Sequence, residues 1–317
     1  MKIPFNKQVK IIISDVDETI ADNFMPASSE MVTELSKILM EGKILFLVSG
    51  SGLRSIQERV INLLPKNLRK QILIAHCSGA EIVGFNETGA PLEKPFLTLS
   101  DSLSEEQKTL WREIIQKVIS EFKLETHPPV TVEEFKNLYG EKVLVVMYED
   151  RGPQITLEFV NSYNLSQEKI EELKNHIPNF DMGDLRIPVM ERASELLNDA
   201  GIPITPRLGG MFALDFAIKG VSKTTAIQFA LNDDKTKNAL GLTSEDLKNP
   251  EVFEIWGDKL SVLSGTDRHM AEALPKEVRS IDFRIENPEE FPKGYNIVVW
   301  NGEKHLHEGL LEYLQNR

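Results

Sequence analysis

The first part of the chain, over residues 8–85, alternates short apolar runs with amphipathic segments. The apolar runs, which are rich in isoleucine, leucine and valine, are residues 9–14, 44–48 and 72–75. Apolar positions three and four residues apart predict helices at residues 29–40 and 53–63. Strands that are apolar throughout and alternate with helices are typical of a parallel sheet covered on both faces. We therefore predict an α/β fold with a Rossmann-like parallel-sheet core.

A different pattern begins near residue 89, after a stretch of turn-forming residues. Apolar runs at residues 142–148 and 154–159 are separated by a short turn, so these two strands must be antiparallel. Further helices are predicted at residues 104–122, 166–175 and 189–200, and further strands at residues 204–207 and 211–217. This order predicts an α+β cap inserted into the core.

The alternation of strands and helices resumes after the insertion. A helix is predicted from Lys223, and the elements after it are apolar runs at residues 252–256 and 294–300 and a helix at residues 303–314. The core is therefore expected to be discontinuous. Its predicted parts are residues 1–88 and 218–317, and the cap is residues 89–217.

The amino-acid composition excludes some classes of binding partner and some cellular locations. Its 49 acidic and 36 basic residues give a net charge of −13, which repels nucleic acids and anionic membranes, so local positive groups must bind any anionic substrate. The single cysteine, Cys77, excludes an internal disulfide and favours a reducing compartment. On a strand beside His76, it is expected to pack as a small hydrophobe. The apolar runs are too short for a signal peptide or a membrane helix, so we expect a cytoplasmic protein of open oligomeric state.

Two carboxylates one residue apart, Asp15 and Asp17, follow the first apolar run. Alone, an Asp-x-Asp sequence is typical of a solvated turn or a helix cap. Carboxylates this close repel each other and lose hydration in a partly dry cleft, so a cation is needed to keep both ionised. Mg²⁺ prefers hard oxygen ligands and combines carboxylates with water and phosphate oxygens. The pair therefore predicts a magnesium site.

Further polar residues follow other elements of the core. Ser49 and Gly50 come directly after the second apolar run, and Asp258 follows the run at residues 252–256. Because the carboxyl ends of parallel strands meet at one edge of a sheet, these groups are expected to lie near the Asp-x-Asp pair. Singly, each is explained as a cap or a solvated side chain. Together they indicate a phosphate-binding site.

In this order the signals resemble the four motifs of the haloacid dehalogenase superfamily of phosphotransferases. The matching residues are Asp15-Val16-Asp17-x-Thr19, then Ser49, then Lys223, and last Gly257-Asp258 with Thr266-Asp267. The insertion stands in the place of that superfamily's type 2 cap. The resemblance implies a Mg²⁺-dependent enzyme acting on a small phosphorylated substrate.

Within the superfamily, the chain resembles the eukaryotic-type phosphomannomutase branch and related sugar-phosphate phosphatases. The similar stretches are residues 47–58, 209–223, 257–267 and 294–298. The chain departs from that branch in having Glu18 in place of a glycine and Ala213 in place of a serine. The cap segment that grips a second phosphate in those mutases has no counterpart near residues 154–161.

The resemblance implies a role for each residue. Asp15 would be the nucleophile that forms a phospho-aspartate, and Asp17 would be the general acid and base. Ser49, Gly50 and Lys223 would bind the phosphoryl group. The Mg²⁺ ligands would be Asp15, Asp17 through its backbone carbonyl, Asp258 and Asp267, or Asp267 would support the site from behind the ligands. The candidates for substrate selection from the cap are Asp215 and Arg207.

The leading hypothesis is a Mg²⁺-dependent phosphatase that acts on a small phosphorylated metabolite, and most specifically on a sugar phosphate. The alternative is a phosphomannomutase-like phosphohexomutase, which needs cap cations for a second phosphate. A nucleotide-sugar glycosyltransferase explains Asp15 and Asp17 but gives Lys223 and Asp258 no role. A non-catalytic binding protein is expected to have lost Asp15 or Lys223, and both are present.

Overall fold

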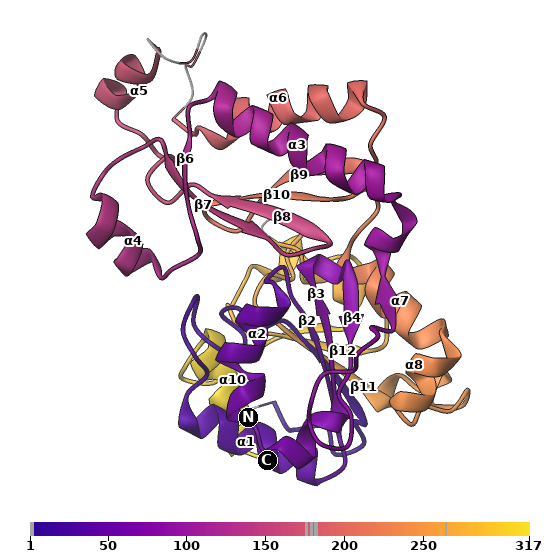
Figure 1. The fold of residues 1–317 in the computed structure, drawn as a ribbon. Helices are drawn as coiled ribbons and strands as arrows, with labels where there is room; N and C mark the ends of the chain where they lie inside the picture. The colour runs from indigo at the N-terminus through magenta and orange to yellow at the C-terminus, as the bar shows by residue number, and fades with distance from the viewer. Residues whose placement is uncertain (1–2, 175–176, 178–179, 181–182, 264) are drawn as a thin grey trace. The chain divides into compact units, whose positions relative to one another are not determined.

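The computed structural model describes residues 3–174, 177, 180, 183–263 and 265–317, and the chain divides into two compact units (Figure 1). Unit 1 comprises Met1–Thr98 and Val221–Arg317, and unit 2 comprises Leu99–Gly220. Unit 1 extends past the expected boundary at residue 88, because β5 (Leu97–Thr98) returns to the sheet and pairs antiparallel with β4 (Glu81–Val83), which is itself antiparallel to its neighbour. Such short strands leave no clear hydrophobic pattern in the sequence.

The sheet of unit 1 has the order β13-β12-β11-β1-β2-β3-β4-β5, and its first six strands are parallel. These strands are β1 (Ile11–Ser14), β2 (Ile44–Val48), β3 (Ile72–His76), β11 (Phe253–Gly257), β12 (Arg279–Asp282) and β13 (Ile297–Val299). The predicted parallel α/β core is confirmed. The strand β12 was not predicted, because its four residues begin and end with a charged side chain.

Different helices cover the two faces of this sheet. Successive residues of β1 point to opposite faces, so Ile12 belongs to the cluster that contains Leu35, whereas Ile13 belongs to the cluster that contains Ala226. The helices of the first cluster are α1 (Ser29–Met40), α2 (Leu53–Arg59) and α10 (Leu306–Gln315). Those on the other side are α7 (Lys223–Asn232), followed by α8 (Asp234–Ala239), and α9 (Arg268–Ala271). With both faces buried, the polar groups of the core gather at the strand ends.

Two local predictions in unit 1 were wrong. The helix expected at residues 53–63 ends at Arg59, because Val60 has φ −131° and ψ −60°, and a 3-10 turn at Ile61–Leu63 follows. Cys77 does not lie on a strand, because β3 ends at His76 and Cys77 begins a 3-10 turn with φ 53°. The thiol is buried, as expected, and its Sγ lies 3.2 Å from Nδ1 of His76.

Unit 2 contains a five-stranded sheet of order β6-β7-β8-β10-β9, in which only the β6–β7 pair is parallel. Its strands are β6 (Glu125–His127), β7 (Val145–Asp150), β8 (Gln154–Glu158), β9 (Ile204–Gly209) and β10 (Ala213–Ile218). Its helices are α3 (Glu105–Glu121), α4 (Val132–Tyr139), α5 (Gln167–Lys174) and α6 (Arg186–Asp199). Helices α3 and α6 lie side by side on one face of the sheet (Figure 1). The helix predicted at residues 166–175 corresponds to α5, and its predicted last residue, Asn175, lies outside the described residues.

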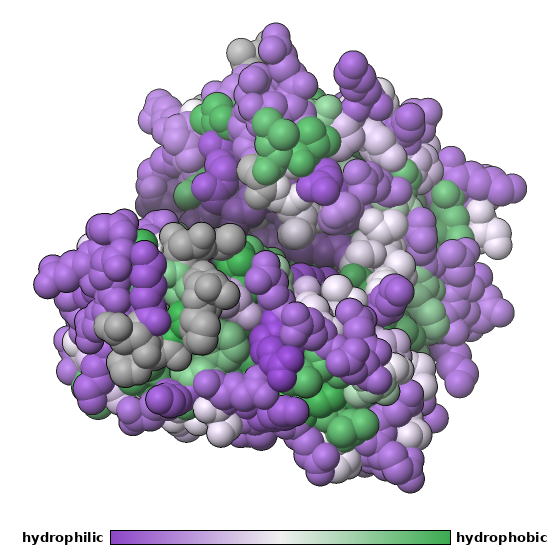
Figure 2. Space-filling model, turned by 90° about the horizontal axis from the view of Figure 1, so that it is seen from above, coloured by the Kyte–Doolittle hydropathy of each residue, from purple (hydrophilic) through white to green (hydrophobic). Residues whose placement is uncertain are grey.

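The surface of the protein is largely polar. On the face drawn in Figure 2, hydrophilic residues predominate and hydrophobic residues form separate small areas between them. Among the described residues, we find no helix with the length and apolar character that crossing a membrane requires.

Candidate active site

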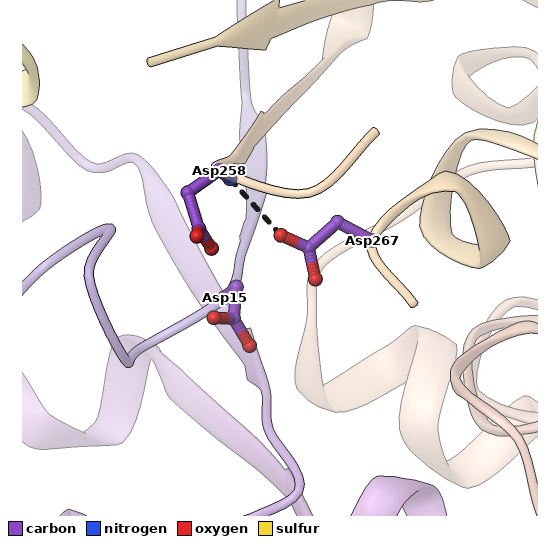
Figure 3. A group of neighbouring side chains, drawn as sticks. All are labelled: Asp15, Asp258 and Asp267. Carbon is purple, nitrogen blue, oxygen red and sulfur yellow. Dashed lines mark hydrogen bonds between the residues drawn. The ribbon is translucent and has the colours of Figure 1, made fainter. Parts of the chain in front are cut away.

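Three aspartates from separate parts of the sequence meet at the carboxyl edge of the parallel sheet (Figure 3). Asp15 directly follows β1, Asp258 directly follows the neighbouring strand β11, and Asp267 precedes α9. Each offers an oxygen that lies within 4.8 Å of the others, and all three residues are buried. The strand order explains the meeting, because β1 and β11 are adjacent and parallel and therefore end at the same edge.

Lys223 provides the positive charge of this group. It is the first residue of α7, whose start is fixed by a capping box between Ser222 and Thr225. Its Nζ donates to Oδ1 of Asp15 at 2.6 Å and to Oδ1 of Asp267 at 2.8 Å, and its side chain is only 4% exposed. The lysine therefore links the two aspartates inside the protein.

The second oxygen of Asp267 is bound by the backbone of the loop after β11. Its Oδ2 accepts from the N–H groups of Asp258 and Lys259 at 3.0 and 3.1 Å, and the first of these bonds is drawn in Figure 3. This approach requires a glycine at position 257, because a Cβ on Gly257 would lie 2.9 Å from Oδ2. Both oxygens of Asp267 thus accept hydrogen bonds within the protein. This arrangement fits a residue that fixes the loop, and it leaves the ligand role of Asp267 open.

The buried group carries more negative than positive charge. Burial raises the pKa of Asp15 to about 7, although Lys223 opposes the rise. Burial, together with Asp267 and Asp15, raises the pKa of Asp258 to about 9. Although burial acts on Asp267 in the same direction, Lys223 and the backbone donors hold its pKa below the usual range. One lysine therefore does not balance three buried carboxylates, whereas a divalent cation would.

The donor set fits Mg²⁺. Carboxylate oxygens are the hard ligands that this ion prefers, and it commonly takes one or two carboxylates together with water and phosphate oxygens. The three aspartates converge within the spacing given above, and they need positive charge to be ionised together. The residues present thus suit the ion that the sequence led us to expect.

Arg284, which sequence reasoning missed, binds the outer side of Asp258. Its Nη2 and Nε donate to Oδ2 of Asp258 at 2.6 and 3.1 Å, and Nη2 also donates to a carboxylate oxygen of Glu18. Asp282, at the end of β12, accepts from the backbone N–H of Arg284 at 3.1 Å and so fixes this loop. Glu18 is the residue at which the sequence departs from the phosphomannomutase pattern. In this chain it pairs with an arginine beside the acidic group.

Asp17 lies in a second polar network beside the three aspartates. Its Oδ1 accepts from Nη1 of Arg59 at 2.6 Å, and its Oδ2 accepts from the hydroxyls of Ser51 and Ser49 at 2.9 and 3.3 Å. The Asp17 carboxylate is thus not one of the carboxylates that group around Lys223. Neither Arg59 nor Ser51 stood out in the sequence, because one is a polar residue of an amphipathic helix and the other a serine in a glycine-rich turn.

Ser49 and Gly50 form the loop that follows β2. Ser49 is fully buried, and its Oγ accepts from the backbone N–H of Ser51 at 3.0 Å. The N-cap of α2 is Gly52, so Ser49 is not a helix cap. The loop therefore holds a hydroxyl and backbone amides beside Asp17, which is the kind of donor set that phosphoryl oxygens accept from.

The two cap candidates occupy neighbouring positions in unit 2. Asp215 of β10 pairs with Arg207 of β9. Oδ1 of Asp215 accepts from Nε2 of Gln154 at 2.9 Å and from the hydroxyl of Thr156 at 2.8 Å. Burial raises the pKa of Asp215, although Arg151 and Arg207 oppose the rise. The structure thus brings the candidates together on one sheet, in a network where neutral donors bind the carboxylate.

The fold of the chain is similar to that of solved structures, although its sequence matches no known family. No family model matches the sequence, and no curated protein matches it. A haloacid dehalogenase-like hydrolase from Bacteroides thetaiotaomicron is 16% identical, with a TM-score of 0.56, and the match covers 96% of this chain and 99% of that one. The C-terminal domain of a trehalose-6-phosphate phosphatase from C. albicans is 13% identical, with a TM-score of 0.53, and the match covers 97% and 91% of the two chains.

At these identities the likeness establishes the fold. The chain has the fold of the haloacid dehalogenase-like hydrolases, which is the fold that the resemblance of its motifs implied. Neither structure singles out the phosphomannomutase branch.

Proposed function

We propose that this chain is a Mg²⁺-dependent phosphatase that hydrolyses a small phosphorylated metabolite, most specifically a sugar phosphate, through a phospho-aspartate. The observation that carries the proposal is the buried Lys223 between Asp15 and Asp267, at 2.6 and 2.8 Å. Transfer of a phosphoryl group needs an oxygen nucleophile and fixed positive charge side by side. The fold, which is shared with a trehalose-6-phosphate phosphatase domain, supports the same reaction class.

In the first half-reaction, Asp15 attacks the phosphorus of a bound monoester. The bond from phosphorus to the ester oxygen breaks while a bond from phosphorus to the Asp15 oxygen forms, and Asp17 gives a proton to the departing alkoxide. Lys223 offsets the charge on the transferring group. The hydroxyl of Ser49 and the loop amides, including that of Gly50, bind its oxygens.

In the second half-reaction, water attacks the phosphorus of the phospho-aspartate. Asp17 takes a proton from this water, the bond from phosphorus to Asp15 breaks, and inorganic phosphate leaves. We assign to the carboxylates of Asp15, Asp258 and Asp267 and the backbone carbonyl of Asp17 the binding of Mg²⁺. When bound, this ion supplies the positive charge that a phosphate dianion requires beside carboxylates.

We assign substrate selection to unit 2, with Asp215 and Arg207 as the candidate residues. The arginines of this sheet have acidic neighbours: Arg151 lies 2.5 Å from Glu149, and the charges of Arg151 and Arg207 both oppose the effect of burial on the pKa of Asp215. Compensated arginines offer little charge for the second phosphate of a sugar bisphosphate. This balance favours a hydrolase over a mutase, because a mutase has to retain the bisphosphate while it reorients.

A phosphate-release screen tests the proposal. We expect the purified chain to release inorganic phosphate from sugar monophosphates when Mg²⁺ is present, and we expect Asp15→Asn to release none. Adding a hexose bisphosphate is expected not to start interconversion of 1- and 6-phosphates. Rapid bisphosphate-dependent isomerisation with little phosphate release would reject the hydrolase and favour the mutase, and inactivity on every phosphorylated compound would reject both.

A further inference from the structure

Arg59 is buried beside the proposed site and binds the segment that follows β1. The side chain of this last residue of α2 is 9% exposed. Its Nη1 donates to Oδ1 of Asp17 at 2.6 Å, its Nε to the carbonyl of Met25 at 2.8 Å and its Nη2 to the carbonyl of Asp22 at 2.7 Å. Its own carbonyl accepts from the N–H of Ala27 at 2.9 Å. The arginine thus ties one helix end to the whole loop that carries Asp17.

The two oxygens of the Asp17 carboxylate have different surroundings. Oδ1 accepts from the guanidinium of Arg59, which has only donors, so this oxygen cannot carry a proton without losing the bond. Oδ2 is bound by the hydroxyls of Ser51 and Ser49, which are neutral and can rotate. A proton on Oδ1 would face the donors of Arg59, whereas a proton on Oδ2 meets groups that can accept it. The network therefore makes the two oxygens chemically unequal.

We propose that Arg59 is a positioning residue for phosphoryl transfer, which anchors Oδ1 of Asp17 so that Oδ2 gives and takes the proton. This inference rests on the proposed function. When the Ser49 hydroxyl turns to a phosphoryl oxygen, Oδ2 loses one donor, while Arg59 still holds the carboxylate in place. The proton then passes from Oδ2 to the departing alkoxide as the ester bond breaks, and in the second half-reaction it passes from water to Oδ2.

The planar guanidinium suits this task, because it donates in three directions at once to Asp17, Asp22 and Met25. A lysine places one charge at one point and cannot keep all three bonds with the same geometry. Arg59→Lys should therefore behave more like Arg59→Gln than like the wild type. Arg54 of the same helix is the matched control, because its side chain is 81% exposed and pairs with Glu58.

The test compares leaving groups. An alkyl phosphate needs a proton on its leaving oxygen, whereas p-nitrophenyl phosphate releases a stable phenolate without one, so a misplaced general acid affects the two substrates differently. For Arg59→Gln and Arg59→Lys we expect kcat/KM to fall about 100-fold on a sugar phosphate and less than about threefold on p-nitrophenyl phosphate. We also expect a burst of nitrophenolate, because the second half-reaction still needs Asp17 as base and the phospho-aspartate accumulates. Arg54→Gln should match the wild type.

Several outcomes would overturn the proposal. It fails if kcat/KM falls equally on both substrates, as general disorder of the site would cause, or if it does not fall at all. Thermal unfolding shows whether the variants fold. If the Arg59 variants do not fold, Ser51→Ala tests the proposal instead, because it removes a donor to Oδ2. Its kcat/KM should fall about three- to tenfold more on the sugar phosphate than on p-nitrophenyl phosphate. An equal loss on both substrates overturns the proposal. A wild-type enzyme that releases no phosphate rejects the proposed function itself, before any variant is compared.

Discussion

Asp15 in unit 1 and Asp215 in unit 2 are both buried aspartates, and burial raises the pKa of each. Their neighbours differ. Asp15 is bound by a buried lysine and lies beside two further carboxylates. Asp215 is bound by the neutral side chains of Gln154 and Thr156. Burial alone therefore does not distinguish the proposed nucleophile from the carboxylate proposed for substrate selection.

The difference lies in the balance of charge. The group around Asp15 remains negative after Lys223 is counted, and Arg284, which binds Asp258, is also paired with Glu18. We therefore expect this group to bind a cation and, with that cation, a phosphate. The network around Asp215 satisfies its carboxylate with hydroxyl and amide donors, and arginines lie near it. Such a network, in which neutral donors hold the carboxylate, specifies structure or selects a ligand.

The largest effect should come from removing the nucleophile. Asp15→Asn should lower turnover by at least about 1,000-fold, a barrier increase of about 4 kcal/mol, because the amide keeps the shape but cannot attack phosphorus. Asp215→Asn is the matched control and should stay within about tenfold of the wild type. Steady-state phosphate release and thermal unfolding check both variants. Comparable losses in the two would show that charge balance does not separate these carboxylates.

Removing Mg²⁺ should also distinguish the aspartates of unit 1 from Asp215 of unit 2. We expect excess chelator to stop phosphate release and Mg²⁺ to restore it. In the absence of substrate, Mg²⁺ at 100 times its dissociation constant should stabilise the wild type by about 2.7 kcal/mol. Asp258→Asn should lose most of this stabilisation and Asp215→Asn should keep it, as measured by thermal unfolding with and without Mg²⁺. Full activity in chelator, or equal stabilisation of both variants, would contradict the assigned ligands.

Asp282 is a further buried carboxylate, and it sharpens the comparison because backbone N–H groups of Arg284 and Glu286 bind it. Burial raises its pKa to about 6, from 3.8. The folded state therefore favours the protonated form, so a stability contribution of about 3 kcal/mol is present below pH 4 and is lost as the pH rises through 6. Asp282→Asn should lack this dependence. Urea unfolding at pH 4 and pH 7 measures it, and parallel pH profiles for the two proteins would show that Asp282 is not responsible.

The sequence was sufficient for the main elements of the core and for the residues at its edge. Continuous apolar runs identified β1, β2 and β11, and the rule that parallel strands end together predicted that Asp15 and Asp258 would meet. A charged residue directly after a buried strand stands out in a sequence, because removing a charge from water costs free energy. Functional residues are therefore most visible in a sequence where a polar residue ends an apolar run.

The arginines of the site could not be found in this way. Arg59 lies on an amphipathic helix, where a polar residue is expected, and its partner Asp17 is 42 positions away. Arg284 follows the short strand β12, which itself gave no pattern, and it reaches Asp258 from a loop. A residue type does not reveal which acceptor a long, flexible side chain will bind. That choice depends on how separate segments pack, and only the folded chain determines it.

The smallest effect should follow from titrating Asp215. Because burial raises its pKa, the folded state favours the protonated carboxyl, so the associated stability is present below the unfolded pKa, near 3.8, and is lost as the pH rises through the folded value. Asp215→Asn cannot ionise, and its amide oxygen can still accept from Gln154 and Thr156. The variant should therefore gain stability relative to the wild type between pH 4 and pH 7.

Urea unfolding of both proteins across this pH range measures that gain. A variant that loses stability relative to the wild type as the pH rises would mean that the arginines, and not burial, dominate the surroundings of Asp215. In that case Asp215 would resemble Asp15 in depending on a fixed cation. The surroundings of Asp15 and Asp215 would then differ only in that three carboxylates converge at Asp15.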